Sequence, residues 1–218
     1  MTISGNDGRG VTVLDYGVGN LHSLLKALAP TQMPVRIDDD PARAVDPRLT
    51  TMLVLPGVGA FTMAADRLAS ARSAIRGAID DGLPVIGICL GMQLLFDASE
   101  EGGGVGLGVI PGRVRRLRAA RVPQIGWNTI EPAGDESSLI EAPLPRVAYY
   151  ANSFVCEPSD ERAVLASSSY EGDRFAAVVR GGPTGNVVGV QFHPEKSSAS
   201  GVRFLQSLVV LSITERAR

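Results

Sequence analysis

The sequence contains little that would tie the protein to a membrane, to nucleic acid or to a metal. None of its apolar runs is long enough to cross a bilayer, and its first residues lack the basic and apolar regions of a signal peptide. A formal net charge of −2 over 218 residues gives no reason to expect a polyanionic partner. The sequence shows no cluster of metal ligands and no phosphate-binding G-x-x-x-x-G-K-[ST] loop. We therefore expect a cytoplasmic protein without metal or cofactor, which binds neither nucleic acid nor membranes.

Cysteine and histidine are also scarce, with two of each in the chain. A disulfide between Cys89 and Cys156 would suit a secreted protein, and nothing else in the sequence indicates secretion. With 44% apolar and 20% charged residues, the chain has ordinary globular proportions and can bury a substantial core. We expect a loose tail over residues 1–10 and one domain over residues 11–213.

The stretch around Cys89 is the first candidate for chemistry. An apolar run over residues 83–88 predicts a buried strand, and residues 92–96 have a helix-like pattern. The turn between them reads G-x-C-x-G, the thiol counterpart of the G-x-S-x-G nucleophile elbow. The N-terminus of the following helix would favour a thiolate. The alternative is a buried structural cysteine, which is the commoner role of a lone cysteine.

A second candidate lies near the C-terminus, where His193, Pro194 and Glu195 follow an apolar run. A thiol nucleophile needs a base, and the base needs an orienting group. Residues two apart in an extended segment point the same way, so His193 and Glu195 can project together. Alone, this motif could equally be a strand end beside a loop. Together with Cys89 it predicts a Cys-His-Glu triad.

Buried strands alternate with helical patterns along the chain: residues 11–14 and 52–55 are expected as strands, and residues from about 60 to 80 as one helix. This order predicts an α/β domain with a largely parallel central sheet flanked by helices. Asn20 and Ser197 are candidate caps of the first and last helices. The first strand, glycine turn and helix do not complete a dinucleotide-binding pattern, because His22 stands where the third glycine would be. The basic residues at 113–118 alternate with apolar ones, as in a strand with one solvated face.

Residues 87–93 and 193–195 together resemble the class I (triad) glutamine amidotransferase family, whose fold is flavodoxin-like. Residues 15–21, 56–61 and 122–128 resemble, more narrowly, the glutaminase subunits of imidazole glycerol phosphate synthases. The resemblance implies hydrolysis of glutamine to glutamate and ammonia through a thioester on Cys89. It also implies a heterodimer with a cyclase subunit, which would use the ammonia for histidine biosynthesis.

The resemblance also assigns roles around the nucleophile. It implies an oxyanion hole made by the backbone N–H groups of Val58 and Leu90. Gly57 and Gly59 flank the Val58 loop and would let its peptide reorient cheaply. A plain strand-to-helix turn is the alternative.

For the substrate, the resemblance points to Gln93 and Glu101. Glu100 is the near alternative to Glu101, and a solvated acidic loop is the alternative to both.

For the partner interface and ammonia path, the resemblance points to Asn20, Trp127 and Lys196, although a lone tryptophan is more often a core anchor. The sequence departs from the family at residues 152–154, where Asn-Ser-Phe replaces the usual His-Ser-Tyr. This puts the local polar contacts in doubt. Two other functions stay open: the glutaminase of another synthase, such as the one that makes pyridoxal phosphate, or a non-catalytic regulatory module on the same fold.

Overall fold

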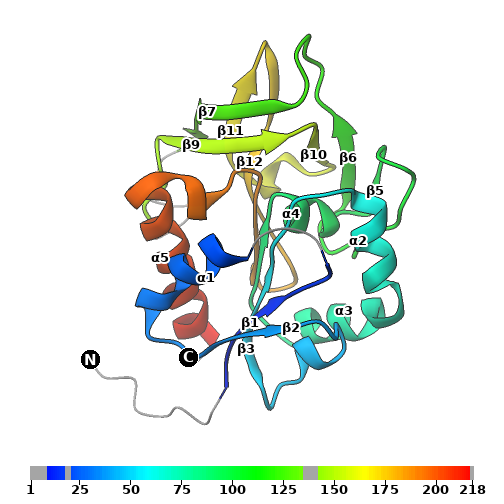
Figure 1. The fold of residues 1–218 in the computed structure, drawn as a ribbon. Coiled ribbons are helices and arrows are strands. Elements are labelled where there is room, and N and C mark those ends of the chain that lie inside the picture. The colour runs from blue at the N-terminus through cyan, green and yellow to red at the C-terminus, as the bar shows by residue number, and fades with distance from the viewer. Residues whose placement is uncertain (1–8, 18–20, 135–141, 217–218) are drawn as a thin grey trace.

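The computed structural model describes residues 9–17, 21–134 and 142–216. Its central sheet has the strand order β2-β1-β3-β4-β13-β12-β11-β8 (Figure 1). The strands of this sheet are β1 (Gly10–Leu14), β2 (Val35–Asp38), β3 (Thr50–Leu55), β4 (Val85–Ile88), β8 (Glu131–Pro132), β11 (Val164–Tyr170), β12 (Asp173–Gly181) and β13 (Val187–Val190). Strands β2, β1, β3, β4 and β13 run parallel, whereas β12, β11 and β8 extend the sheet in antiparallel pairs.

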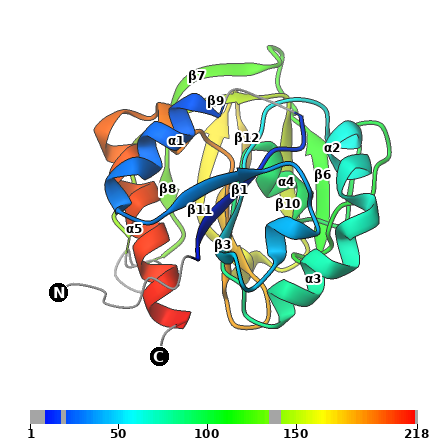
Figure 2. The ribbon, with the colours of Figure 1, turned by 60° about the horizontal axis from the view of Figure 1, so that its bottom comes forward.

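Helices cover both faces of the parallel part of the sheet (Figures 1 and 2). One face carries α1 (His22–Leu28) and α5 (Ser198–Arg216), and the other carries α2 (Phe61–Leu68) and α3 (Arg72–Asp80). Successive side chains of a strand point to opposite faces. Met52 therefore packs in the core beneath α1 and α5, and Leu53 in the core beneath α2 and α3. Burial on both faces explains why the sequence shows continuous apolar runs. The expected α/β fold is confirmed.

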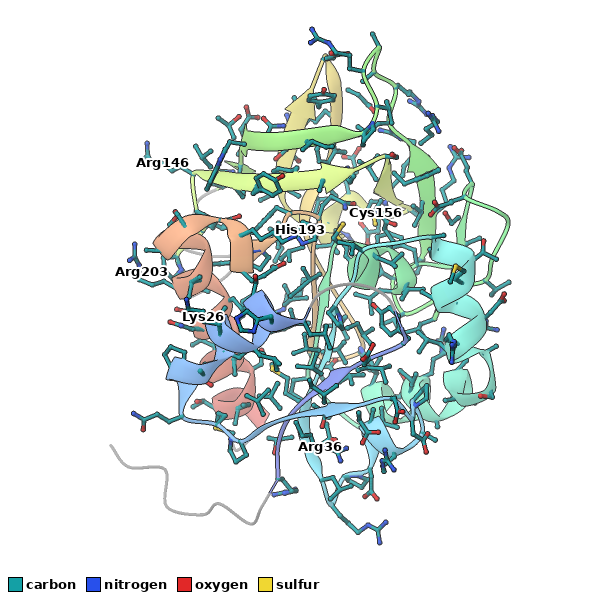
Figure 3. All side chains as sticks on the ribbon, viewed as in Figure 1. Lys26, Arg36, Arg146, Cys156, His193 and Arg203 are labelled. Carbon is teal, nitrogen blue, oxygen red and sulfur yellow. The ribbon has the colours of Figure 1, made fainter. Side chains whose placement is uncertain are left out.

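Two smaller sheets stand beside the central one. The first has the order β10-β6-β5, formed by β10 (Phe154–Pro158), β6 (Gly112–Arg116) and β5 (Ala98–Ser99). The second pairs β7 (Gln124–Thr129) with β9 (Val147–Asn152), antiparallel. In Figure 1 these two strands cross the upper end of the molecule, and Figure 3 shows His193 just below β9.

The expected single helix over residues 60–80 is wrong. A 3-10 turn at Ala69–Ala71 separates α2 from α3, and the two helices run in different directions in Figure 1. Leu68 and Ala71 are both buried. Their spacing of three residues fits the 3-10 repeat better than the α-helical one.

The ends of the chain differ from expectation in small ways. Gly10, placed in the tail by the sequence, is the first residue of β1 and is buried; residues 1–8 lie outside the described part. Asn20 also lies outside it, and the N-cap residue of α1 is Leu21, without a side-chain cap bond. Within the described ranges no helix is long and apolar enough to cross a membrane.

Candidate active site

Cys89 lies in a sharp turn between β4 and α4 (Leu90–Leu94). Its backbone angles, φ 51° and ψ −104°, are strained for a residue with a side chain. The turn is held from both sides, because Cys89 N–H donates to the Val190 carbonyl (2.7 Å) and a Cβ on Gly91 would overlap the Leu55 carbonyl. A Cβ on Gly87 would lie 2.7 Å from the Gly91 oxygen. The flanking glycines are therefore needed for close backbone approach, as expected of an elbow.

His193 follows β13 and is 2% exposed. Its Nδ1 lies 2.9 Å from Glu195 Oε1. The expectation that an extended segment carries this pair is wrong, because Pro194–Lys196 form a 3-10 turn. Proline suits the first position of a helical turn, since its fixed φ is already helical and its missing N–H is not needed there. The turn nevertheless brings the carboxylate to the ring.

The electrostatics around His193 favour its charged form. Burial lowers the pKa of His193, but the negative charge of Cys89, followed by the hydrogen bond and charge of Glu195, outweighs it and raises that pKa to about 10. The other ring nitrogen, Nε2, is buried, and no group in the described residues forms a standard hydrogen bond with it. This nitrogen is thus left for proton exchange at the sulfur.

A cavity of ≈ 150 Å³ opens beside Cys89. It is lined by Val58, Gly59, Cys89, Leu90, Gln93, Glu101, Pro123, Ala151, Asn152, Ser153 and Phe154. Most of the residues that the sequence nominated for substrate and oxyanion therefore meet in one place. Glu101 lines the cavity and its Oε2 accepts from Phe61 N–H (2.9 Å). Glu100 instead accepts from the backbone N–H of Arg116, so the geometry favours Glu101 of the two.

The Gly57 loop adopts one particular orientation. Leu90 N–H donates to the Gly57 carbonyl at 3.4 Å, a long and weak bond. In a planar trans peptide the C=O and the N–H point in opposite directions, so Val58 N–H faces away from Leu90. Gly57 (φ 151°) and Gly59 (φ 132°) both have backbone angles that favour glycine. The two expected oxyanion donors are not aligned in this structure.

Gln191 is a site residue that the sequence did not single out. It is fully buried, its Nε2 donates to Cys89 Sγ (3.6 Å), and its Oε1 accepts from Gln93 Nε2 (3.5 Å). A polar residue directly after the buried strand β13 and two before His193 was the available signal. Gln93 and Asn152 both donate to the Phe154 carbonyl at 3.1 Å. The cavity wall therefore keeps hydrogen bonds despite the departure at residues 152–154.

The outer face of the β7–β9 pair carries exposed apolar side chains, and we call it the docking face. Ile125 is 67% exposed, Trp127 56% and Val147 41%. The rings of Trp127 and Tyr149 meet edge to face, with centroids 6.2 Å apart. Trp127 is therefore not a core anchor. An exposed apolar patch of this kind is typical of a protein interface.

The 3-10 turn Pro194–Lys196 follows His193, and we call it the catalytic turn. Its last residue, Lys196, is exposed. In the described part of the chain no group of three or more His, Cys, Asp or Glu side chains forms a possible metal site.

Comparison with known proteins identifies the family and the fold. The family model described as glutamine amidotransferase class-I matches residues 12–210. The imidazole glycerol phosphate synthase subunit HisH of Halobacterium salinarum is 41% identical over 215 residues, covering 95% of this chain and 96% of the relative. The same subunit of Salinibacter ruber is 41% identical over 217 residues, covering 94% and 96%. A crystal structure of a glutamine amidotransferase superimposes with a TM-score of 0.70 at 20% identity, covering 93% of this chain and 99% of that one. This last likeness concerns the fold alone.

Proposed function

The chain belongs to the class I glutamine amidotransferase family, and from this premise we propose that it is the glutaminase subunit of an imidazole glycerol phosphate synthase. Cys89 on the cavity, with His193 interacting with it and held by Glu195, carries the proposal. The similarity to subunits of that synthase over nearly the full length supports the choice of complex. A non-catalytic module would have no need for a strained cysteine beside a buried imidazole whose pKa is raised.

The reaction begins with attack of the Cys89 sulfur on the side-chain amide carbon of glutamine. A C–S bond forms and the carbonyl oxygen becomes an oxyanion, which N–H groups of Leu90 and Val58 would stabilise once both face it. The C–N bond then breaks, and ammonia leaves with a proton from His193 Nε2. Water, deprotonated by His193, attacks the thioester carbon, and the C–S bond breaks to release glutamate and the sulfur of Cys89 as a thiolate. Glu195 keeps the imidazole oriented throughout.

The substrate and the partner complete the proposal. The Glu101 carboxylate accepts a hydrogen bond from the α-ammonium group of glutamine. Gln93 supplies a neutral amide contact in the same cavity. The docking face binds a cyclase subunit, with Trp127 and Lys196 near the route of the ammonia. Asn20, to which the resemblance assigns the same role, lies outside the described residues. We place the heterodimer in the cytoplasm, because the reaction requires Cys89 as a free thiol.

Substitution of the nucleophile tests the function directly. In the reconstituted complex, Cys89→Ser should abolish glutamine-dependent synthesis and spare synthesis from added ammonia, which bypasses only the glutaminase step. Cys156→Ala is the matched control, since the second cysteine is equally buried but outside the triad. It should retain both activities. Loss of both activities in Cys89→Ser, at equal concentration of complex, would mean that Cys89 serves the fold or the interface.

A further inference from the structure

Ser197 lies at the centre of a closed set of hydrogen bonds behind the catalytic base. Its Oγ accepts from Tyr149 N–H (2.9 Å) and donates to the His193 carbonyl (2.6 Å). His193 N–H in turn donates to the Tyr149 carbonyl (2.9 Å). Both backbone groups of Tyr149 therefore bind the segment that carries the base. We call these three residues the β9 clasp.

The clasp uses the edge of β9 that β7 leaves unpaired. In an antiparallel pair, a strand directs the backbone groups of alternate residues toward its partner and those of the others away from it. The two-stranded sheet pairs β9 with β7 only, so Tyr149 can present its N–H and C=O to the catalytic turn. Ser197 is fully buried, and its hydroxyl is the side-chain group that joins this edge to His193.

The serine has a different role from the one its sequence position indicates. Its carbonyl accepts from Gly201 N–H (3.0 Å), as expected of a residue that precedes a helix. Its hydroxyl, however, bonds to β9 and to His193 instead of to the first turn of α5. A Cβ on Gly201 would lie 2.6 Å from the Pro194 oxygen, so α5 packs tightly against this turn. The turn is thus fixed between α5 and β9.

The other side of Tyr149 belongs to the docking face. Its ring contacts Trp127 edge to face, and Trp127 is 56% exposed. A partner that displaces β9 at Tyr149 through this aromatic pair also displaces the backbone N–H and C=O of Tyr149, which bind Ser197 and His193. Ser197 passes that displacement to the carbonyl of His193, whose ring holds the proton to be transferred.

We propose that Ser197 is a positioning residue, which ties the orientation of His193 to the docking face through the β9 clasp. The inference rests on the proposed function and adds a route from the partner surface to the base. It predicts that the hydroxyl matters for the rate of the partner-bound enzyme, while glutamine binding and ammonia use do not depend on it. Small displacements of a catalytic group cost large factors in rate.

The test compares Ser197→Ala with wild type in the ligand-bound complex, with Ser200→Ala as the matched control from the next turn. We expect kcat for glutamine hydrolysis to fall by about tenfold to a hundredfold. KM for glutamine should stay within about twofold, and ammonia-dependent synthesis should not change, because neither binding nor docking uses the hydroxyl. Ser200→Ala should behave as wild type. Ser197→Cys keeps the size of the side chain with a weaker hydrogen-bonding group, and serves if the alanine variant does not fold.

Two results would overturn the inference. An unchanged kcat would show that the clasp does not position His193. A parallel fall of kcat, ammonia-dependent synthesis and melting temperature would show that Ser197 only supports the fold. Wild-type complex without glutaminase activity would instead refute the proposed function, so the two failures are distinguishable.

Discussion

At the scale of single residues, the proposed chemistry divides between a proton carrier and the group that orients it. Glu195→Gln keeps a hydrogen-bonding partner for His193 Nδ1 but removes the negative charge that stabilises the imidazolium. His193→Ala removes the proton carrier itself. We expect both variants to lose activity in the partner-stimulated assay, and His193→Ala to lose more. Equal losses would contradict the division of roles, and an unreduced rate in His193→Ala would contradict the triad.

The raised pKa of His193 has a consequence for stability. A histidine whose pKa rises from 6.5 to about 10 on folding stabilises the folded state fully below pH 6.5, and this contribution is lost as the pH rises through 10. Cys89 is the leading cause that raises the pKa of His193. The Cys89→Ser variant should therefore lose less folding stability than wild type between pH 6.5 and 10. Urea unfolding at several pH values between 6.5 and 10 measures the difference. Identical pH dependence in the two proteins would mean that Cys89 does not raise the pKa of His193.

At the scale of elements, the hairpin of β11 and β12 is tied to β6 by a buried ion pair. Arg115 and Asp173 form two bonds of 2.7 and 2.8 Å, and both side chains are 6% exposed. Asp173 also accepts from Arg118 N–H. Burial raises the pKa of Asp173, but these donors outweigh it and hold the pKa below its usual value. Of the basic stretch expected as a strand over residues 113–118, residues 113–116 lie in β6, which ends at Arg116, and Arg115 is buried where a solvated face was expected.

Breaking this pair should be costly. Asp173→Ala leaves the buried guanidinium of Arg115 with Glu157, at 3.2 Å, as its remaining carboxylate partner. We therefore expect a loss of stability that approaches the roughly 3–5 kcal/mol of a fully broken buried pair. Asp160→Ala is the control, because its ion pair with Arg162 lies at the surface and should contribute little. Urea unfolding of both variants gives the comparison. Equal and small effects would show that the hairpin is held mainly by its apolar contacts.

The elements also show how far sequence reasoning reaches. The buried parallel strands, the elbow and the pairing of His193 with Glu195 follow from local patterns, because each needs a particular residue type at a particular place. The antiparallel extension and the buried Arg115 do not, since they depend on strands that pair far along the chain. Gln191 was missed for the same reason, because its contact with Cys89 joins residues 102 positions apart.

At the scale of the whole molecule, the docking face is the surface through which the partner would act. Trp127→Ala should weaken binding of the cyclase subunit by at least tenfold, since exposed aromatic anchors often dominate interfaces. It should leave the melting temperature unchanged, because the side chain is 56% exposed. Ile37→Ala is the control, an exposed apolar residue on the outermost strand β2. Equal affinities of the two variants would place the interface elsewhere.

The orientation of the Gly57 peptide predicts that the isolated chain is nearly silent as a glutaminase. Its carbonyl accepts from Leu90 N–H, so the donor from Val58 is turned away and that from Leu90 is engaged. A missing oxyanion donor costs about 2.7–4 kcal/mol, or roughly two to three powers of ten in rate. A partner that binds the reoriented loop more tightly would shift the population toward it.

The measurement compares glutamine hydrolysis by the purified chain with hydrolysis in the ligand-bound complex, and equal rates would contradict the switch. Gly57→Ala identifies the element that switches, because an added Cβ would lie 2.8 Å from the Tyr16 hydroxyl and 3.3 Å from Leu90 Cβ. Such crowding, at a φ of 151° that alanine resists, should restrict the loop and reduce stimulation. Stimulation that persists in both Gly57→Ala and Gly59→Ala would keep the activation but assign it to another element. The segment around Lys196 would then be the first candidate, because the β9 clasp joins it to the docking face.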